Sequence, residues 1–133
     1  MAKGERPKDS RRLSRKKTKQ KIFFDEVCRM TKLVPKNKLT TYGAIARAMG
    51  VDNYSRHVGF ALGKVKASDG VPWWRVINSS GRISFRPKDR VGEGTRAKPF
   101  TSLQSIKLAG EGHTFTEAGA IVGWTKKLHD FNR

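Results

Sequence analysis

The sequence predicts a small α/β single domain of winged-helix type, in which a helix-turn-helix precedes a short β-hairpin, with a disordered basic arm at the N-terminus. Three observations predict this fold. Apolar residues recur at helical spacing in three segments between residues 22 and 64. The second and third of these segments meet at a three-residue turn after Gly50. The apolar pair Val76-Ile77 then precedes Ser79-Ser80-Gly81 and Ile83, a pattern typical of a hairpin.

Size and charge restrict the expected partners. The chain has 133 residues, enough for one core. Its 29 Lys and Arg against 11 Asp and Glu leave a net charge of +18, which repels itself unless a polyanion neutralises it. Nucleic acid is the polyanion that we expect. No stretch approaches the roughly 20 apolar residues of a spanning helix, and no apolar signal segment stands at the N-terminus, so we do not expect a membrane partner. The lone cysteine, Cys28, favours a reducing, intracellular compartment.

We expect residues 1–21 to form the disordered basic arm and residues 22–133 to form the folded domain. The arm holds ten basic and two acidic residues and a single leucine, so it lacks the material for a core. Without the arm, the rest of the chain still carries +10. The folded part is therefore basic on its own account. The basic clusters of the arm suit a nuclear-import signal as well as a phosphate-binding role.

Three helices are expected in the first half of the domain. An apolar stripe begins at residue 22 and ends at Pro35, a cap at Thr40 or Thr41 opens a second helix that stops at Gly50, and a third spans about residues 54–64. The short turn between the last two indicates a helix-turn-helix, although a plain αα-hairpin fits the spacing equally well. The charge of the folded part favours the DNA-binding interpretation. Beyond the hairpin, residues 86–100 are expected to form a mobile loop and residues 102–108 a short helix.

Three sequence blocks carry a family resemblance. They are residues 41–46 (TYGAIA), 55–62 (SRHVGFAL) and 71–77 (VPWWRVI). In this order and spacing they resemble the C-terminal domain of the O6-alkylguanine-DNA alkyltransferases, and more closely the alkyltransferase-like proteins. The resemblance covers roughly residues 23–110 and rests on three blocks in register.

The third block decides which chemistry the resemblance implies. Alkyltransferases carry Pro-Cys-His-Arg there, and the cysteine takes the alkyl group after the histidine has activated it. Trp73 stands at the place of the cysteine and Trp74 at that of the histidine. An indole has neither a usable lone pair nor a suitably acidic proton, so alkyl transfer at this position is chemically excluded. The loss of the histidine departs even from the alkyltransferase-like proteins, which usually keep it.

The two tryptophans are given different roles. Trp73 is expected to be the wall of a pocket for a flipped base, because an aromatic face stacks on a base without reacting with it. A place in the core is the alternative for Trp73. Trp74 is instead expected to belong to the core or to lie behind the pocket.

The resemblance also implies a DNA-contacting face. Arg56 stands where the family carries an arginine that fills the gap left by the flipped nucleotide, and Tyr42 where a tyrosine contacts the neighbouring phosphate. Gly59 would let the recognition helix approach the backbone closely in the minor groove. Lys64 and Arg75 complete the expected DNA contacts. The plainer alternatives are a phosphate contact for Arg56 and a core position for Tyr42.

The expected lesion pocket consists of Tyr42, Trp73, Asn78, Ser80 and Arg86. In alkyltransferase-like proteins an arginine at the place of Arg86 lies against the modified base, where a cation over the purine face is attracted to it. Arginines in loops are otherwise ordinary solvated charge. Asn78 and Ser80 would supply polar groups at the rim of the pocket.

No catalytic residue, metal site or cofactor is expected. Cys28 lies on the apolar side of the first helix, where burial would raise the pKa of its thiol and keep it inert. The three histidines have no cysteine or carboxylate partner at ligand spacing.

The sequence therefore predicts a non-enzymatic protein that recognises O6-alkylguanine-type lesions in double-stranded DNA by base flipping. The family implies that such a complex flags the lesion for nucleotide excision repair proteins. We expect a monomer, in the nucleus of a eukaryote or otherwise in the cytoplasm or nucleoid. Two alternatives stay open. One is a true alkyltransferase with another nucleophile, and the other is a general DNA- or RNA-binding or ribonucleoprotein component without lesion specificity.

Overall fold

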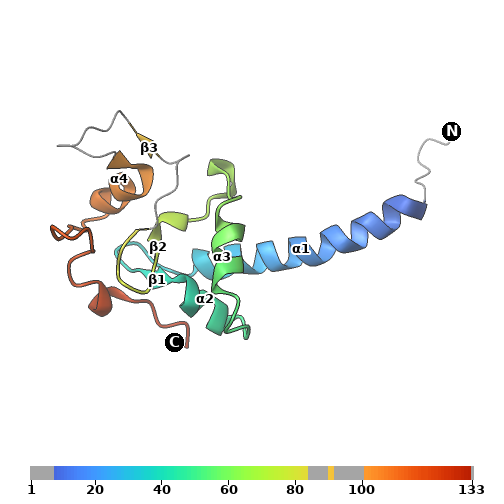
Figure 1. The fold of residues 1–133 in the computed structure, drawn as a ribbon, viewed down its shortest axis with the longest axis horizontal. Helices are drawn as coiled ribbons and strands as arrows, with labels where there is room; N and C mark the ends of the chain where they lie inside the picture. Colours follow the sequence, from blue (N-terminus) through green and yellow to red (C-terminus); the bar gives the residue numbers. More distant parts are fainter. Residues whose placement is uncertain (1–7, 84–89, 92–100, 133) are drawn as a thin grey trace.

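The computed structural model describes residues 8–83, 90–91 and 101–132, and it describes the side chains of residues 19–83 and 102–132. Three helices gather on one side of a central pair of short strands, and a fourth helix and the C-terminal segment lie on the other side (Figure 1). The prediction of a small α/β single domain is confirmed. No helix in the described ranges is long and apolar enough to cross a bilayer.

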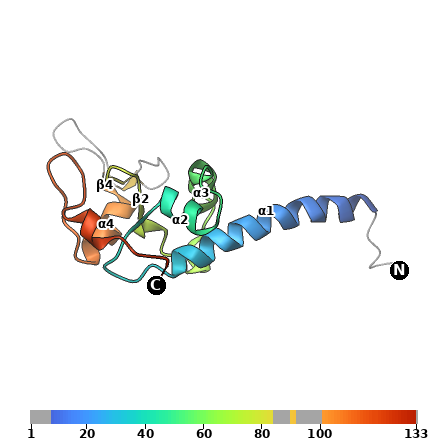
Figure 2. The ribbon, with the colours of Figure 1, turned by 90° about the horizontal axis from the view of Figure 1, so that it is seen from below.

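Helix α1 (Lys8–Lys32) is longer than expected. Its C-terminal part buries Val27 and Met30, as the apolar spacing predicts, and it ends before Pro35. Residues 8–21, which we expected to be disordered, continue the same helix and project beyond the domain (Figure 1 and Figure 2). Lys, Arg and Gln are good helix formers, so a helix fixed by packing at one end extends readily through them.

Helices α2 (Tyr42–Ala48) and α3 (Ser55–Leu62) form the expected helix-turn-helix. The Oγ1 atom of Thr41 accepts a hydrogen bond from the N–H of Ala44 at 3.0 Å and caps α2. After α2, Gly50 adopts a φ of 81°, the left-handed conformation that glycine tolerates best. Helix α3 packs against both α1 and α2.

The short strands differ from the predicted hairpin. Strands β1 (Thr40–Thr41) and β2 (Val76–Ile77) pair in parallel, with Thr40 opposite Val76. Ile83, the expected partner of β2, lies in no strand, and the turn after β2 instead brings Arg82 to a bridge with Ala120. Both residues of β2 are fully buried, which suits a parallel pair covered on both faces better than a wing that is solvated on one face.

A second strand pair precedes the last α-helix. Strands β3 (Arg90–Val91) and β4 (Thr101–Ser102) are antiparallel. Strand β3 falls within the segment expected to be a loop, most of which lies outside the described residues. Helix α4 (Leu103–Gly110) is the expected short helix, and the Oγ atom of Ser102 caps it by accepting from the N–H of Ser105 at 3.0 Å.

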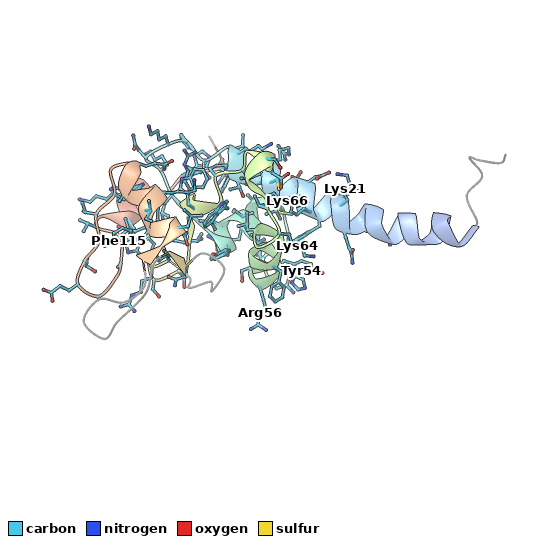
Figure 3. All side chains as sticks on the ribbon, turned by 90° about the horizontal axis from the view of Figure 1, so that it is seen from above. Lys21, Tyr54, Arg56, Lys64, Lys66 and Phe115 are labelled. Atoms are coloured by element: carbon cyan, nitrogen blue, oxygen red, sulfur yellow. The ribbon has the colours of Figure 1, made fainter. Side chains whose placement is uncertain are left out.

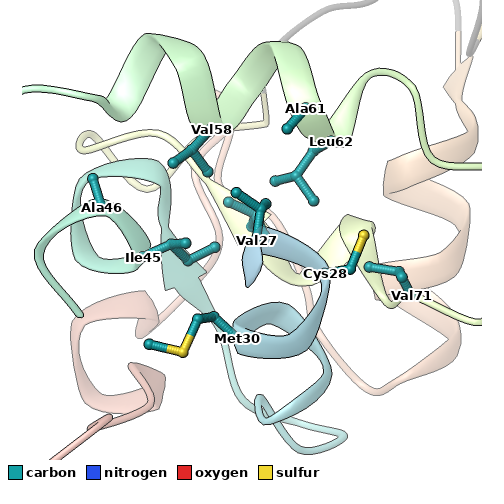
Figure 4. Packing of buried hydrophobic residues seen from close by; sticks show 10 residues of the cluster. Val27, Cys28, Met30, Ile45, Ala46, Val58, Ala61, Leu62 and Val71 are labelled. Atoms are coloured by element: carbon teal, nitrogen blue, oxygen red, sulfur yellow. The ribbon is translucent and has the colours of Figure 1, made fainter. Parts of the chain in front are cut away.

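Two apolar clusters form the core. The first lies among α1, α2 and α3 (Figure 4) and consists of Val27, Cys28, Met30, Ile45, Ala46, Val58, Ala61, Leu62, Val71 and Val76. The second lies towards α4 and consists of Leu39, Ile77, Leu108 and Ile121. Successive residues of a strand point to opposite faces, so Val76 joins the first cluster and Ile77 the second. Strand β2 therefore divides the core.

The C-terminal segment closes the second cluster. Its 3₁₀ turn η5 (Trp124–Lys127) lies against the turn after β2, where a Cβ at Gly81 would sit 2.2 Å from Nε1 of Trp124. Gly81 also has a φ of 77°, so only glycine fits there. Leu39 donates its N–H to the carbonyl of Lys127 at 2.9 Å and ties the chain end to the entry of β1.

Candidate nucleic-acid interface

Helix α3 has one face exposed to solvent, and this face carries the basic side chain of Arg56. Its inward residues belong to the first cluster, whereas Arg56, His57 and Phe60 are exposed. Arg56 is the second residue of the helix and extends away from the domain (Figure 3). Within the described residues the Arg56 guanidinium has no hydrogen bond or ion pair, so it is available to a ligand. Lys64 is also exposed and follows α3 directly.

Tyr42 and Gly59 meet where α2 crosses α3. Tyr42, the first residue of α2, is half-buried against the first cluster, so its plainer role as a packing aromatic is partly met. A Cβ added at Gly59 would lie 3.7 Å from the Tyr42 ring, an ordinary van der Waals contact. Packing inside the protein therefore does not require glycine at position 59. The absence of a side chain at Gly59 therefore matters only to a molecule that approaches α3 from outside the protein.

Trp73 and Trp74 share the 3₁₀ turn η3 (Trp73–Arg75) but pack in opposite directions. Their ring centroids are 6.0 Å apart and the rings are nearly perpendicular, at 84°. Trp73 is half-buried against the first cluster, together with Tyr42, whereas Trp74 packs against the second cluster. Tyr42 and Trp73 therefore share the first cluster, and Gly59 borders the Tyr42 ring, whereas Trp74 belongs with the second cluster.

Polar contacts fix Trp74 in place. Its Nε1 donates to Oε2 of Glu111 at 2.9 Å, and Nζ of Lys107 lies 4.6 Å from its ring centroid. The carbonyl of Trp74 also accepts from Nε2 of Gln104 at 3.0 Å. These contacts hold Trp74 against the second cluster, which agrees with the core position that was one of its two expected roles.

Arg75, an expected DNA contact, is engaged by partners inside the protein instead. Its Nη2 lies 2.7 Å from Oε2 of Glu111, its Nε also reaches that carboxylate, and its Nη1 donates to the carbonyl of Val34 at 2.8 Å. The two side chains are only 14% and 9% exposed. Because Glu111 and Val34 engage all three of its nitrogens, the Arg75 guanidinium holds η3 to the end of α4 and to the segment after α1. It is therefore poorly placed to bind a phosphate.

Sequence reasoning did not identify Glu111 or Gln104 as residues of this region. Glu111 follows α4 directly, and Gln104 is buried, with Nε2 donating to the carbonyls of Trp74 and Val76. Burial alone would raise the pKa of Glu111, but the hydrogen bonds from Arg75 and Trp74 outweigh it and hold that pKa below its usual value. Glu111 is thus a charged acceptor that orients both residues. A single carboxylate after a helix looks like any surface acid until its partners are placed.

His113 lies close to this carboxylate in a buried setting. Its Nδ1 is 3.2 Å from Nζ of Lys127, and its Nε2 has no partner within the described part of the chain. Burial lowers the pKa of His113, and the Lys127 ammonium lowers it further. The imidazole is therefore neutral at physiological pH, with Nδ1 placed to accept from the lysine.

Asn78 and Ser80 form the tight turn after β2. The Oδ1 atom of Asn78 accepts from the N–H groups of Ser80 at 2.9 Å and Arg82 at 3.1 Å, so its side chain shapes the turn itself. Ser80 is exposed at the tip. Arg86, the expected cation over the lesion, lies outside the described residues. The structure therefore does not assemble the complete predicted pocket.

A scan against family models matches residues 22–101 to the DNA-binding domain of 6-O-methylguanine DNA methyltransferase. A DNA base-flipping protein of Vibrio parahaemolyticus is 37% identical over 99 residues, which cover 74% of this chain and 88% of that protein. The chain belongs to the alkyltransferase-like family.

Further relatives agree with this assignment. Alkyltransferase-like protein 1 of Schizosaccharomyces pombe is 41% identical over 93 residues, covering 64% of this chain and 82% of that protein. The crystal structure of the S. pombe ATL in complex with DNA superposes with a TM-score of 0.65 at 31% identity, covering 83% of this chain and 96% of that one. A second S. pombe structure, Atl1 with damaged DNA containing O6-carboxymethylguanine, gives a TM-score of 0.64 over the same shares.

The only cysteine of the chain lacks the properties of a reactive thiol. Cys28 is 8% exposed in the first cluster, and burial, with a smaller contribution from Asp69, raises the pKa of its thiol. A neutral, enclosed thiol is a poor alkyl acceptor. Over the described ranges, His, Cys, Asp and Glu also form no group of three that could hold a metal ion.

Proposed function

We propose that the protein recognises O6-alkylguanine-type lesions in double-stranded DNA by flipping the modified base out of the helix and holding it without chemical change. The observation that carries the proposal is Arg56, which is exposed near the start of α3 and has no hydrogen bond or ion pair within the described residues, on the helix whose Gly59 borders the Tyr42 ring. The relatives named as base-flipping proteins and the S. pombe complexes with DNA support it.

Each of these residues has a physical role in the proposed complex. The planar Arg56 guanidinium stacks in the gap left by the flipped nucleotide and hydrogen-bonds the orphaned partner base. Gly59 keeps the α3 backbone bare where the duplex approaches, and Tyr42 contacts the phosphate beside the lesion. The half-buried Trp73 offers an aromatic wall to the flipped base. Lys64 adds a phosphate contact.

The proposal includes the absence of alkyl transfer. The indole of Trp73 is not a nucleophile, the indole of Trp74 is held by Glu111, and Cys28 is enclosed in the first cluster. Incubation with an oligonucleotide containing O6-benzylguanine, followed by intact-protein mass measurement, checks this point. We expect an unchanged mass, and a benzyl adduct would establish an enzyme instead.

Base flipping itself is tested with 2-aminopurine placed next to O6-methylguanine in a duplex, because 2-aminopurine fluoresces more strongly when unstacked. We expect fluorescence to rise on binding of the wild type and not on binding of Arg56→Ala. Lys126→Ala is the control, since it removes the same charge from η5, away from α3. Equal fluorescence with wild type and Arg56→Ala would contradict the role of Arg56.

A downstream role follows by family resemblance. We propose that the bound complex marks the lesion for nucleotide excision repair proteins. A pull-down on duplexes with and without the lesion tests it: repair proteins should be retained only when both the lesion and the wild-type chain are present.

A general nucleic-acid binder is the second candidate, and the projecting basic part of α1 favours it. Residues 8–21 belong to the part of α1 that projects from the domain (Figure 2), and such a cationic helix attracts any duplex through counterion release. This candidate predicts equal affinity for modified and unmodified DNA. It also predicts that Arg56→Ala and Lys126→Ala weaken binding to the same small extent.

A further inference from the structure

A groove of about 910 Å³ lies between α1 and α3. Aromatic side chains from both helices line it: Phe23, Phe24, Tyr54, His57 and Phe60. Phe60 is 64% exposed and Tyr54 39%, although aromatic rings of this size ordinarily stay covered. Neither side chain is among the expected DNA contacts. The aromatic part of the groove is therefore a surface that the proposed function does not use, whereas Lys64 at its edge is also an expected DNA contact.

The ring contacts make the wall of this groove a continuous aromatic surface. The ring centroids of Tyr54 and His57 are 4.5 Å apart and the rings are stacked at 27°. The Phe23 ring lies 6.1 Å from that of Tyr54 and joins α1 to α3 across the floor. A groove between two helices, with an aromatic floor, has the form that accepts the apolar face of a further helix.

The rim of the groove is cationic. Lys19 and Lys21 come from α1 and Lys64 from the end of α3, where Figure 3 shows Lys21 and Lys64 on either side. None of the described residues that line the groove is acidic, and the nearby Asp25 is exposed and paired with Lys21 at 3.4 Å. A second copy of a chain with a charge of +18 would be repelled from such a rim. Charge complementarity favours an acidic occupant.

We infer that the groove between α1 and α3 binds an acidic amphipathic helix of a partner protein. Its apolar residues, spaced at i, i+3, i+4 and i+7, would cover Phe23 and Phe60, and its carboxylates would face Lys19 and Lys64. Arg56 does not line the groove and projects beyond Tyr54 (Figure 3), so the partner helix leaves it uncovered. The groove shares Lys64 with the proposed DNA contacts, but its aromatic residues are not among those contacts.

The test uses the full chain and a fluorescent peptide of about 16 residues. This length holds a helix when a covalent bridge joins two side chains on the polar face of the peptide. The peptide carries Leu and Phe at i, i+3, i+4 and i+7 and Glu, Gln and Ala elsewhere. A peptide of the same composition with scrambled apolar positions is the control ligand. Anisotropy titrations at fixed salt compare wild type with Phe60→Ser, Lys19→Glu and the control Ile106→Ser, which changes an exposed apolar residue of α4.

We expect the amphipathic peptide to bind the wild type and Ile106→Ser equally and the scrambled peptide to bind at least tenfold more weakly. Phe60→Ser should weaken binding about tenfold or more, the effect of losing one buried aromatic contact. Lys19→Glu should weaken it too, and Phe60→Ser should leave the thermal midpoint and duplex affinity unchanged because the ring is already exposed.

Four results would overturn the inference. Equal binding of the two peptides, or of wild type and Phe60→Ser, would reduce the interaction to charge attraction alone. Loss of duplex affinity in Phe60→Ser would assign the groove to DNA. A dimer in sedimentation that Phe60→Ser dissociates would assign the groove to a second copy of the chain.

Discussion

Glu111→Gln removes the buried charge that holds both Arg75 and Trp74. Glutamine keeps one acceptor oxygen and the size of the side chain, so the change isolates the ion pair. The pair lies 2.7 Å apart with side chains 14% and 9% exposed, and removing one partner of a buried pair costs about 3 kcal/mol or more because the other charge is left uncompensated. In a domain of this size that lowers the thermal midpoint by about 10 °C. Thermal unfolding followed by circular dichroism measures it.

Glu26→Gln is the matched control. Glu26 pairs with Arg29 at 2.6 Å, but these side chains are 36% and 62% exposed. An exposed pair of this kind contributes less than about 1 kcal/mol. The contact lengths are nearly equal and the burial differs, so the difference between the variants measures the effect of burial. If Glu111→Gln lowers the midpoint no more than Glu26→Gln, the stabilising role given to Glu111 is wrong.

Three further predictions concern single residues. Gly59→Ala should leave stability unchanged or slightly raised, since its Cβ meets the Tyr42 ring at an ordinary 3.7 Å. The same substitution should weaken duplex binding. Unchanged duplex affinity would remove the reason given for this glycine. Burial depresses the pKa of His113, so the unfolded chain takes up a proton first and stability should fall as pH drops below about 6.5. Between pH 8 and pH 5.5, the free energy of unfolding measured with denaturant should fall less in His113→Gln than in the wild type. An equal fall in both proteins would contradict the assignment. Cys28 should react with iodoacetamide only after unfolding, as followed by mass; rapid labelling of the native protein would show an accessible thiol.

Local signals in the sequence predicted the helical half of the fold. The Thr41 cap, the stop at Gly50 and the apolar spacing of α3 act within a few residues of one another, so the helix-turn-helix could be read directly. Strand β2 could not be placed in this way. Its partner β1 lies about 35 residues earlier in the chain, and a two-residue strand carries no signal of which segment it pairs with.

The composition of the basic arm did not predict that helix α1 includes residues 8–21. A lack of apolar residues shows that residues 8–21 have no core of their own, but helix continuation needs only compatible residues and a fixed end. The packed residues from Val27 onward supply that fixed end. Whether the arm and domain are separate units stays a prediction.

The candidate site was predicted only where a block of sequence carries it. Arg56, Gly59 and Trp73 were assigned from such blocks, and their roles stay predictions. Arg75 was assigned to DNA because a basic residue beside a motif looks exposed, but it is engaged by Glu111. Its partner Glu111 is 36 residues away, and that separation hides the pair from any local pattern. Buried ion pairs between distant segments become visible only in the folded chain.

The central claim is that the protein prefers a modified base, and one binding titration tests it most directly. Duplexes with guanine or O6-methylguanine at one position are titrated at one stated salt concentration, because so basic a chain binds any duplex more tightly as salt falls. We predict tighter binding of the O6-methylguanine duplex by the wild type and loss of that preference in Arg56→Ala. Equal affinity of the wild type for both duplexes would contradict lesion recognition.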